Sequence, residues 1–194
     1  ITPTQTRYPE GGSQTWNASA YASYKWISNE KILLNGGLRY SRAGLSSDFN
    51  AGILPYEHIQ INNGALTGSL GLIYTPNTKW QIDAILSSGF RNPNVDDFGK
   101  VRAKDDYITV PNENLSPEYS YNAELGISRI VEGYMKIELV AYYTYLKDAI
   151  VRTTFQVNGQ DSLLYDGDLY RITANYNAAQ GVIYGGSLRF SSNF

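Results

Sequence analysis

The segment TWNASAYASYKWI, Thr15–Ile27, decides the fold because its residues alternate strictly between two kinds. The residues at even positions are apolar or aromatic: Trp16, Ala18, Ala20, Ala22, Tyr24 and Trp26. Those at odd positions, from Thr15 to Lys25, are polar except for Tyr21. An alternation of period two over this length predicts a β-strand with one apolar face.

Six further segments repeat the same alternation. They are Lys31–Arg42, Leu66–Thr75, Trp80–Phe90, Glu118–Val131, Tyr134–Ile150 and Gly181–Phe194. Several of these segments are longer than the about 5–6 residues that are usual for strands of soluble proteins. Together with the first segment they predict about seven long strands.

The connections between these segments alternate between short and long. The short ones are Ser28–Glu30, Pro76–Lys79 and Glu132–Gly133. The long ones are Ala43–Ala65, Arg91–Pro117 and Val151–Gln180. Long structureless loops count against a compact soluble domain, whereas outer-membrane β-barrels join their strands by tight periplasmic turns and long outer loops in alternation. The pattern therefore predicts an all-β fold, an antiparallel transmembrane β-barrel.

The last long connection contains turn signals of its own. Asn158-Gly159 favours a tight hairpin between Thr154–Val157 and Ser162–Tyr165. Asp166-Gly167 marks a second turn. We expect these turns to project outside the membrane rather than to form barrel wall.

Large aromatic residues near the ends of the predicted strands suit the two edges of a membrane. Trp16 and Trp26 are ten residues apart, and Trp80 and Phe90 repeat this spacing. Ten residues rising ~3.3 Å each and tilted by ~40° span roughly 25 Å, the height of the lipid-facing band of a barrel. We expect these four residues to form the girdles that contact the lipid bilayer and its lipopolysaccharide. A soluble, aromatic-rich β-sandwich that binds carbohydrate remains an alternative, because its strands also alternate.

The composition argues against several other functions. The chain has 194 residues and a net charge of −2, so it lacks the basic footprint of a nucleic-acid-binding protein. It has no cysteine, and its single histidine, His58, is expected to be a solvated loop residue. The carboxylate pairs Asp96-Asp97 and Asp105-Asp106 lack the spacing of a Ca²⁺ loop and are expected only to solvate a loop. We therefore predict no enzyme, no catalytic residue and no metal site.

Four stretches resemble the barrel of TonB-dependent outer-membrane receptors, and most closely the iron-complex receptors of the Bacteroidetes type. They read SSGFRNPNVDDFGKV, VPNENLSPEYSYNAELGIS, AYYTYLKDAIVR and VNGQDSLLYDGDLYR. The resemblance implies a 22-stranded barrel that is filled by an N-terminal plug and coupled to TonB through a short upstream box. Residues 1–194 are then a partial barrel, a fragment of its C-terminal portion, from which the plug and the TonB box are absent.

The resemblance also implies a function. A receptor of this family sits in the bacterial outer membrane, where it binds a bulky nutrient and imports it actively with energy delivered through TonB. The expected cargo is a ferric iron complex of the siderophore type, and no cofactor is needed. A passive porin-like channel is the alternative within the membrane-barrel class.

Two motifs carry the resemblance at strand–loop junctions. The first resembles the family's FRxP and reads Phe90-Arg91-Asn92-Pro93; the second resembles NPNLxPE and spans Pro111 to Glu118. We interpret the motifs as a clamp that anchors the intervening loop, with Arg91 and Glu118 forming a buried ion pair. The expected anchoring residues are Phe90, Arg91, Pro93, Asn112, Pro117 and Glu118.

The stretch between the two motifs is where a ligand is expected to bind. The cationic and aromatic residues suited to an anionic ferric chelate are Arg91, Arg102, Lys104 and Tyr107. Haem receptors of this family carry a histidine ligand between these motifs, and residues 94–110 contain none. Iron import is therefore expected, and haem is disfavoured as the cargo.

Overall fold

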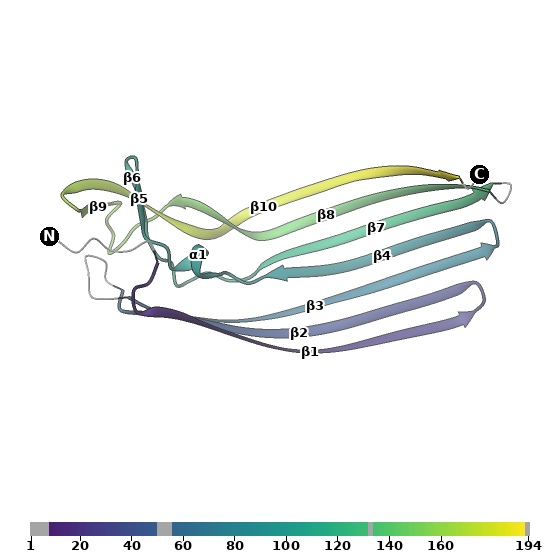
Figure 1. Cartoon of the computed structure of the whole chain (residues 1–194), viewed down its shortest axis with the longest axis horizontal. Helices are drawn as coiled ribbons and strands as arrows, with labels where there is room; N and C mark the ends of the chain where they lie inside the picture. Colours follow the sequence, from purple (N-terminus) through teal and green to yellow (C-terminus); the bar gives the residue numbers. More distant parts are fainter. Residues whose placement is uncertain (1–7, 50–55, 132–133, 193–194) are drawn as a thin grey trace.

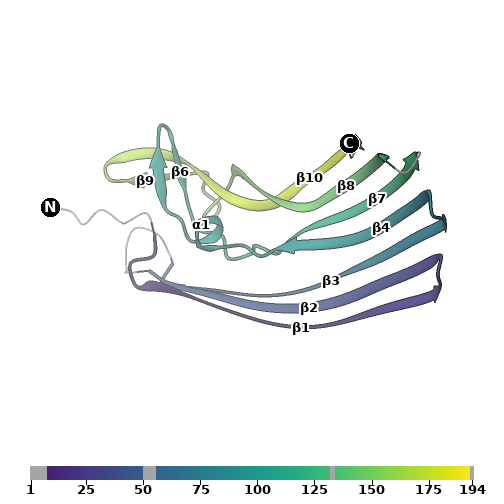
Figure 2. The same ribbon diagram turned by 45° about the vertical axis from the view of Figure 1, so that its right-hand side comes forward.

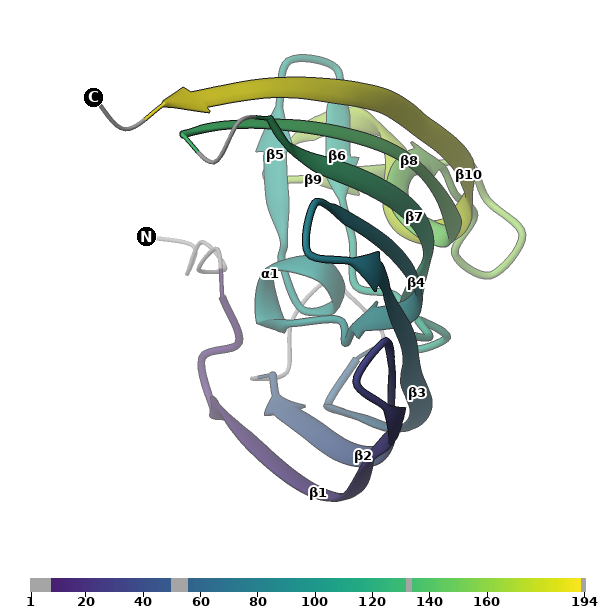
Figure 3. The ribbon, with the colours of Figure 1, turned by 90° about the vertical axis from the view of Figure 1, so that its right-hand side faces the viewer.

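The computed structural model describes residues 8–49, 56–131 and 134–192. The chain forms one sheet that curls into an open half barrel (Figures 1 and 3). Its long strands are β1 (Gly12–Asn29), β2 (Ile32–Asp48), β3 (His58–Asn77), β4 (Trp80–Arg91), β7 (Glu118–Val131), β8 (Met135–Thr154) and β10 (Asp168–Ser192). The short elements are α1 (Val95–Phe98), β5 (Arg102–Lys104), β6 (Tyr107–Thr109) and β9 (Ser162–Tyr165). Within the described ranges, no helix has the length and apolarity needed to cross a membrane.

The register of the sheet joins the predicted apolar faces into one surface. Ala22 lies opposite Leu38, and further across the sheet Ala123 lies between Leu86 and Tyr143. Residues that are directly opposed on paired strands lie on the same side of a sheet. This surface is the convex side of the half barrel and is called the outer face below; the concave, mostly polar side is the inner face. The prediction of an alternating antiparallel barrel wall is confirmed.

Tight turns close one end of the sheet, called the turn end, and two of them use the same device. In Asn29-Glu30-Lys31 the Asn29 Oδ1 accepts hydrogen bonds from the backbone N–H of Lys31 (2.9 Å) and Ile32 (3.0 Å). In the next turn Asn77 Oδ1 accepts from the N–H of Lys79 (2.9 Å). Such asparagine-capped turns explain why these connections need so few residues.

The strands are longer at the opposite end, called the loop end, than the alternation predicted. β2 continues to Asp48 and β3 begins at His58, so much of the predicted loop Ala43–Ala65 is strand. The alternation changes phase there: the apolar Leu45, Ile59 and Ile61 are buried on the inner face, whereas lower in the same strands the apolar residues lie on the outer face. The strands were predicted from a continuous apolar outer face, and that pattern ends where the phase changes. The predicted strands were therefore too short.

The predicted hairpin within Val151–Gln180 was wrong in its pairing. β9 pairs with the beginning of β10 through a turn at Asp166-Gly167, not with Thr154–Val157. Both turn residues have positive φ, 51° and 93°, as a type I′ turn requires. The Asn158-Gly159 turn closes only an isolated bridge between Val157 and Gln160. β10 itself begins at Asp168, so the wall strand extends through much of the predicted loop.

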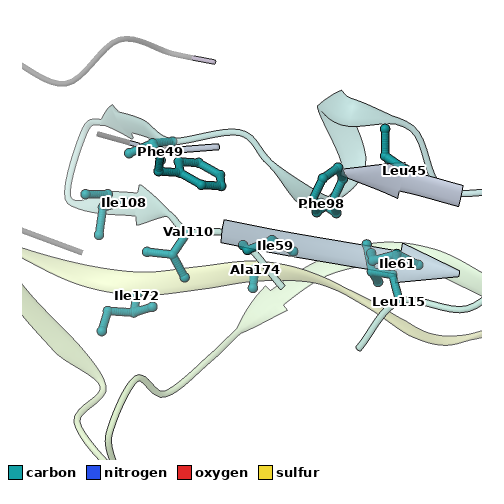
Figure 4. Packing of buried hydrophobic residues seen from close by; sticks show 11 residues of the cluster. Leu45, Phe49, Ile59, Ile61, Phe98, Ile108, Val110, Leu115, Ile172 and Ala174 are labelled. Carbon is teal, nitrogen blue, oxygen red and sulfur yellow. The ribbon is translucent and has the colours of Figure 1, made fainter. Parts of the chain in front are cut away.

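The connection between β4 and β7, residues 92–117, folds inward rather than outward. It carries α1, β5 and β6, which lie on the concave side of the half barrel at the loop end (Figures 2 and 3). Its apolar side chains pack against the extended strands in the cluster shown in Figure 4, whose buried members are Leu45, Phe49, Ile59, Ile61, Phe98, Val101, Ile108, Val110, Leu115, Ile172 and Ala174. This inward-folded segment is called the mouth loop below.

Candidate functional site at the loop end

The mouth loop begins with a capped helical turn. Asn94 Oδ1 accepts from the N–H of Asp97 (3.0 Å), and Asp97 Oδ2 accepts from the N–H of Asn94 (3.0 Å). This reciprocal capping box satisfies backbone donors that a short helix leaves open. The other carboxylate, Asp96, accepts from the Tyr8 hydroxyl (3.1 Å) and lies 3.4 Å from Lys100 Nζ. The expectation that Asp96-Asp97 only solvates a loop was wrong, because both carboxylates hold the loop together.

Arg91 links this helical turn to the barrel wall. Its Nη1 lies 2.6 Å from Asp97 Oδ2, and its Nε donates to Glu118 Oε2. Glu118 Oε1 in turn accepts from the backbone N–H of Ile150 on β8 (2.6 Å). The Arg91–Glu118 pair predicted from the sequence is present. The pair was expected to be buried, but 46% of the Arg91 side chain is exposed. The reason is that the pair lies at the open mouth of the half barrel.

Asparagine side chains fasten the far end of the mouth loop to β10. Asn112 is buried and donates through Nδ2 to the carbonyl of Asn175 (2.9 Å), while Asn175 Nδ2 donates to the carbonyl of Asp97 (2.7 Å). Asn177 exchanges two hydrogen bonds of 2.9 Å with the backbone of Ser116. Buried amide side chains that satisfy backbone groups on both sides give a loop one fixed position. Asn112 is a predicted anchoring residue; Asn175 and Asn177 were missed.

The remaining predicted anchoring residues lie at the two junctions of the loop. Pro93 and Pro117 are buried, and Phe90 lies opposite Tyr119 on the outer face. Prolines at these places cannot extend the ladder between β4 and β7, and that pairing ends at Arg91 and Glu118. Five of the six predicted anchoring residues therefore lie at the two junctions, and Asn112 holds the loop to β10 instead; their contribution to its stability stays a prediction.

The β5–β6 hairpin has one apolar and one cationic face. β6 pairs in parallel with β10, so Ile108 and Ile172 share the face that packs into the cluster. The opposite face carries Arg102, Lys104, Tyr107 and Arg171, all exposed. Among the residues that the structure describes, none of these three cations lies within ion-pair distance of a carboxylate. This group is called the cationic face.

Arg91 does not belong to the cationic face. Its guanidinium is engaged by two carboxylates at the base of the loop, while Arg102, Lys104 and Tyr107 stand together on the hairpin. Arg171 was missed because it lies more than sixty residues further along the chain, and only the β6–β10 pairing brings it to Tyr107. A ligand role for any of these residues stays a prediction.

The connection between β2 and β3 borders the same mouth. His58 was expected in a loop, yet it begins β3, and its Nδ1 lies 2.6 Å from Asp48 Oδ1. Tyr56 packs against Phe49 with ring centroids 6.4 Å apart. Burial raises the pKa of the Tyr56 hydroxyl, and the charge of Glu113 raises that pKa further. In the described residues no group of three or more His, Cys, Asp or Glu side chains is placed to hold a metal ion.

The predicted girdle residues lie on the outer face. Trp16 and Trp26 are near opposite ends of β1 and are 48% and 47% exposed. Trp80 is at the turn end of β4, where the guanidinium of Arg129 lies 5.0 Å from its ring centroid. Outward exposure of large aromatic side chains is what a lipid-facing band requires, and their depth in the membrane stays a prediction.

Comparison with known proteins places this half barrel in a family. The sequence matches the profile described as "TonB dependent receptor-like, beta-barrel" over residues 1–194, the whole chain. The chain belongs to the TonB-dependent receptor β-barrel family. Such barrels reside in the bacterial outer membrane, are transport receptors rather than enzymes, and need no cofactor. No curated protein sequence matches the chain.

Several solved structures of this family share the fold at low sequence identity. A double mutant of the Serratia marcescens hemophore receptor HasR, in complex with HasA and heme, has a TM-score of 0.75 at 15% identity, over 97% of this chain and 33% of that chain. The FrpB iron transporter from Neisseria meningitidis has a TM-score of 0.67 at 16% identity, over 94% and 24%. The copper transporter OprC has 0.70 at 16% identity, over 94% and 26%. This chain thus spans a quarter to a third of the length of these receptors.

Proposed function

We propose that residues 1–194 are part of an outer-membrane receptor that binds a bulky nutrient and imports it actively. The proposed cargo is a ferric complex of the siderophore type, and the proposed energy source is TonB, acting through a plug that lies outside these residues. Family membership supports a transport receptor, and the related structures are of iron, siderophore, heme and copper receptors or transporters.

The observation that carries the proposal is the cationic face on a fixed mouth loop. Arg102, Lys104 and Arg171 present positive charge next to the Tyr107 ring, and the loop beneath them is held by Arg91 and the asparagine bonds. Unpaired cations on a rigid support attract an anionic chelate without first having to release a carboxylate. Aromatic and cationic groups together suit a ligand that is bulky, planar in part and negatively charged.

The test uses the full-length receptor and a panel of ferric siderophores. The triple variant Arg102→Gln, Lys104→Gln, Arg171→Gln is expected to bind its ferric complex about tenfold more weakly, equivalent to ~1.4 kcal/mol. Lys79→Gln, which removes one charge at the turn end, is the matched control and should leave binding unchanged. Equal affinity of the triple variant and the wild type for every complex in the panel would contradict the role of the cationic face.

Energisation is tested separately by uptake into whole cells. Import of the radiolabelled complex should stop when the proton-motive force is collapsed or when TonB is deleted, while surface binding persists. Uptake that continues at the same rate under both conditions would instead identify a passive channel.

A further inference from the structure

The barrel wall divides between β3 and β4. β3 pairs with β2 from Tyr74 to His58, but it pairs with β4 only between Asn77 and Ser69. Beyond Ser87, β4 continues to Arg91 with ladder pairs to β7 and none to β3. In Figures 1 and 2 the β1–β3 strands and the β4–β10 strands separate towards the loop end. The division is internal to the described sheet, so it does not depend on strands that would complete the barrel.

A side chain replaces the backbone pairing at the point of division. Ser88 Oγ accepts a hydrogen bond from the N–H of Gly68 (2.9 Å) and donates to its carbonyl (3.4 Å). A Cβ at Gly68 would lie 2.8 Å from Leu38 Cδ2 and 2.9 Å from the carbonyl oxygen of Gly37, so no side chain fits there. The wall is therefore thin at this point, since one hydroxyl group stands where the next ladder pair would be.

Hollows lie on both sides of the thin wall. A hollow of about 750 Å³ on the outer face and one of about 320 Å³ towards the inner face share the lining residues Thr67, Gly68, Ser69, Ser87 and Ser88. The outer hollow is bordered by leucine and tyrosine, while Tyr21, Ser23 and Arg39 line the inner one. The outer volume is in the range of ~300–1,000 Å³ that is usual for small-molecule sites.

We propose that the outer hollow binds one hydrocarbon chain of a membrane lipid. The hollow is continuous with the lipid-facing surface, and its border consists of exposed apolar side chains such as Leu38, Leu66, Leu70 and Leu86. It lies between the levels of the two tryptophans of β1, since its lining residues Gly36, Gly37 and Leu38 stand between Leu34, the partner of Trp26, and Gly44, the partner of Trp16. A chain seated there covers backbone that the missing β3–β4 pairs leave in contact with lipid, where uncovered polar groups are costly. The site requires only the outer-membrane location and is independent of which nutrient is imported.

Photolabelling of the full-length receptor tests the site directly. The receptor is reconstituted into phosphatidylcholine vesicles that contain a trace of phosphatidylcholine with a diazirine on one acyl chain, and the labelled peptides are mapped by mass spectrometry. Labelling is expected to be several-fold denser at residues 66–70 and 121–123 than at Ala18 and Ala20, which lie on the outer face of β1 and do not line the hollow. An even distribution over the outer face, or protection of the hollow by another part of the receptor, would overturn the proposal.

A variant whose new side chain fills the hollow is compared with a variant that carries the same substitution elsewhere on the outer face. Ala123→Phe places a ring in the hollow and should reduce labelling of residues 66–70 several-fold, whereas Ala18→Phe adds the same ring elsewhere on the outer face and should not. Heat-modifiable gel mobility shows whether each variant has folded. If Ala123→Phe does not fold, Leu86→Phe fills the same hollow from β4. Unchanged labelling in a folded, filled variant counts against the site, and the wild-type map decides the proposal even if neither variant folds.

Discussion

Arg91 sets the position of the mouth loop through two carboxylates on different elements. Asp97 belongs to α1 and Glu118 to β7, so one guanidinium fixes both the beginning and the end of residues 92–117 against the wall. The planar fork of arginine suits two simultaneous carboxylate contacts, which the ammonium of lysine cannot match in geometry. Because Arg91 is half-exposed, solvent screens its ion pairs and reduces their contribution to stability. The two contacts therefore act mainly by orienting the mouth loop.

Removal of Arg91 is expected to loosen the loop without disturbing the barrel. Arg91→Gln should increase the rate at which proteinase K cleaves the full-length receptor within residues 99–110, because two charge-assisted hydrogen bonds to the loop base are lost. The barrel should keep its heat-modifiable mobility. Lys79→Gln is the control, and identical cleavage kinetics in Arg91→Gln and wild type would show that the arginine does not hold the loop.

Asn175 is expected to hold the mouth loop in place as strongly as Arg91 does, although its side chain is neutral. Asn175→Ala removes the hydrogen bond to the carbonyl of Asp97 and leaves a part-buried acceptor unsatisfied, which costs about 1 kcal/mol. The same protease assay should report faster cleavage of the mouth loop. Ser191→Ala, at the turn end of β10, is the comparison variant and should behave like wild type.

At the scale of the strand, we expect the change of phase to mark the edge of the membrane. In the membrane the outside of a barrel is hydrocarbon, so apolar residues face outward; beyond it the outside is water, and apolar residues face the packed mouth loop instead. Leu66 on the outer face and Ile61 on the inner face show this change within β3. The alternation of period two thus continues through the strand, but its apolar residues pass from the outer face to the inner face.

Cysteine accessibility tests the phase of β3 beyond the membrane. Gln60→Cys is expected to react rapidly with a membrane-impermeant maleimide added to whole cells, because Gln60 is exposed. Ile59→Cys should react slowly, since Ile59 is 1% exposed and lies in the cluster under the mouth loop. These 194 residues contain no cysteine, which keeps their background low. Reversed reactivities would mean that β3 keeps its lipid-facing phase to the end.

At the scale of the whole molecule, the outer face sets the depth of the barrel in the membrane. Trp16 and Trp26 are on this face near opposite ends of β1, and aromatic residues of this kind favour the headgroup regions. The inner face is mostly polar outside the part that the mouth loop covers. The same wall therefore faces lipid on one side and supports the inward-folded loop on the other.

Depth-graded fluorescence quenching tests this placement. In single-tryptophan versions of the full-length receptor, both Trp16 and Trp26 should be quenched most strongly by groups near the headgroups. Strong quenching of either residue by a group near the bilayer centre would contradict the predicted girdle for β1.

The sequence by itself determined the wall. Alternation in segments such as Thr15–Ile27 depends on local backbone geometry, and for that reason the long strands, the short turns between them and their outer face were predicted. The two motifs also located the base of the loop, including the Arg91–Glu118 pair. Each of these features is encoded by neighbouring residues or by adjacent strands.

Only the tertiary structure decided where the mouth loop goes and what it assembles. The inward fold depends on packing between residues far apart in sequence, such as Ile59, Phe98 and Ile172, and no local period reports such contacts. The parallel pairing of β6 with β10 brought Arg171 to Tyr107, and the early end of the β3–β4 ladder produced the thin wall at Ser88. These arrangements arise because the apolar face of a loop must be buried somewhere, and only the folded chain determines which surface is within reach.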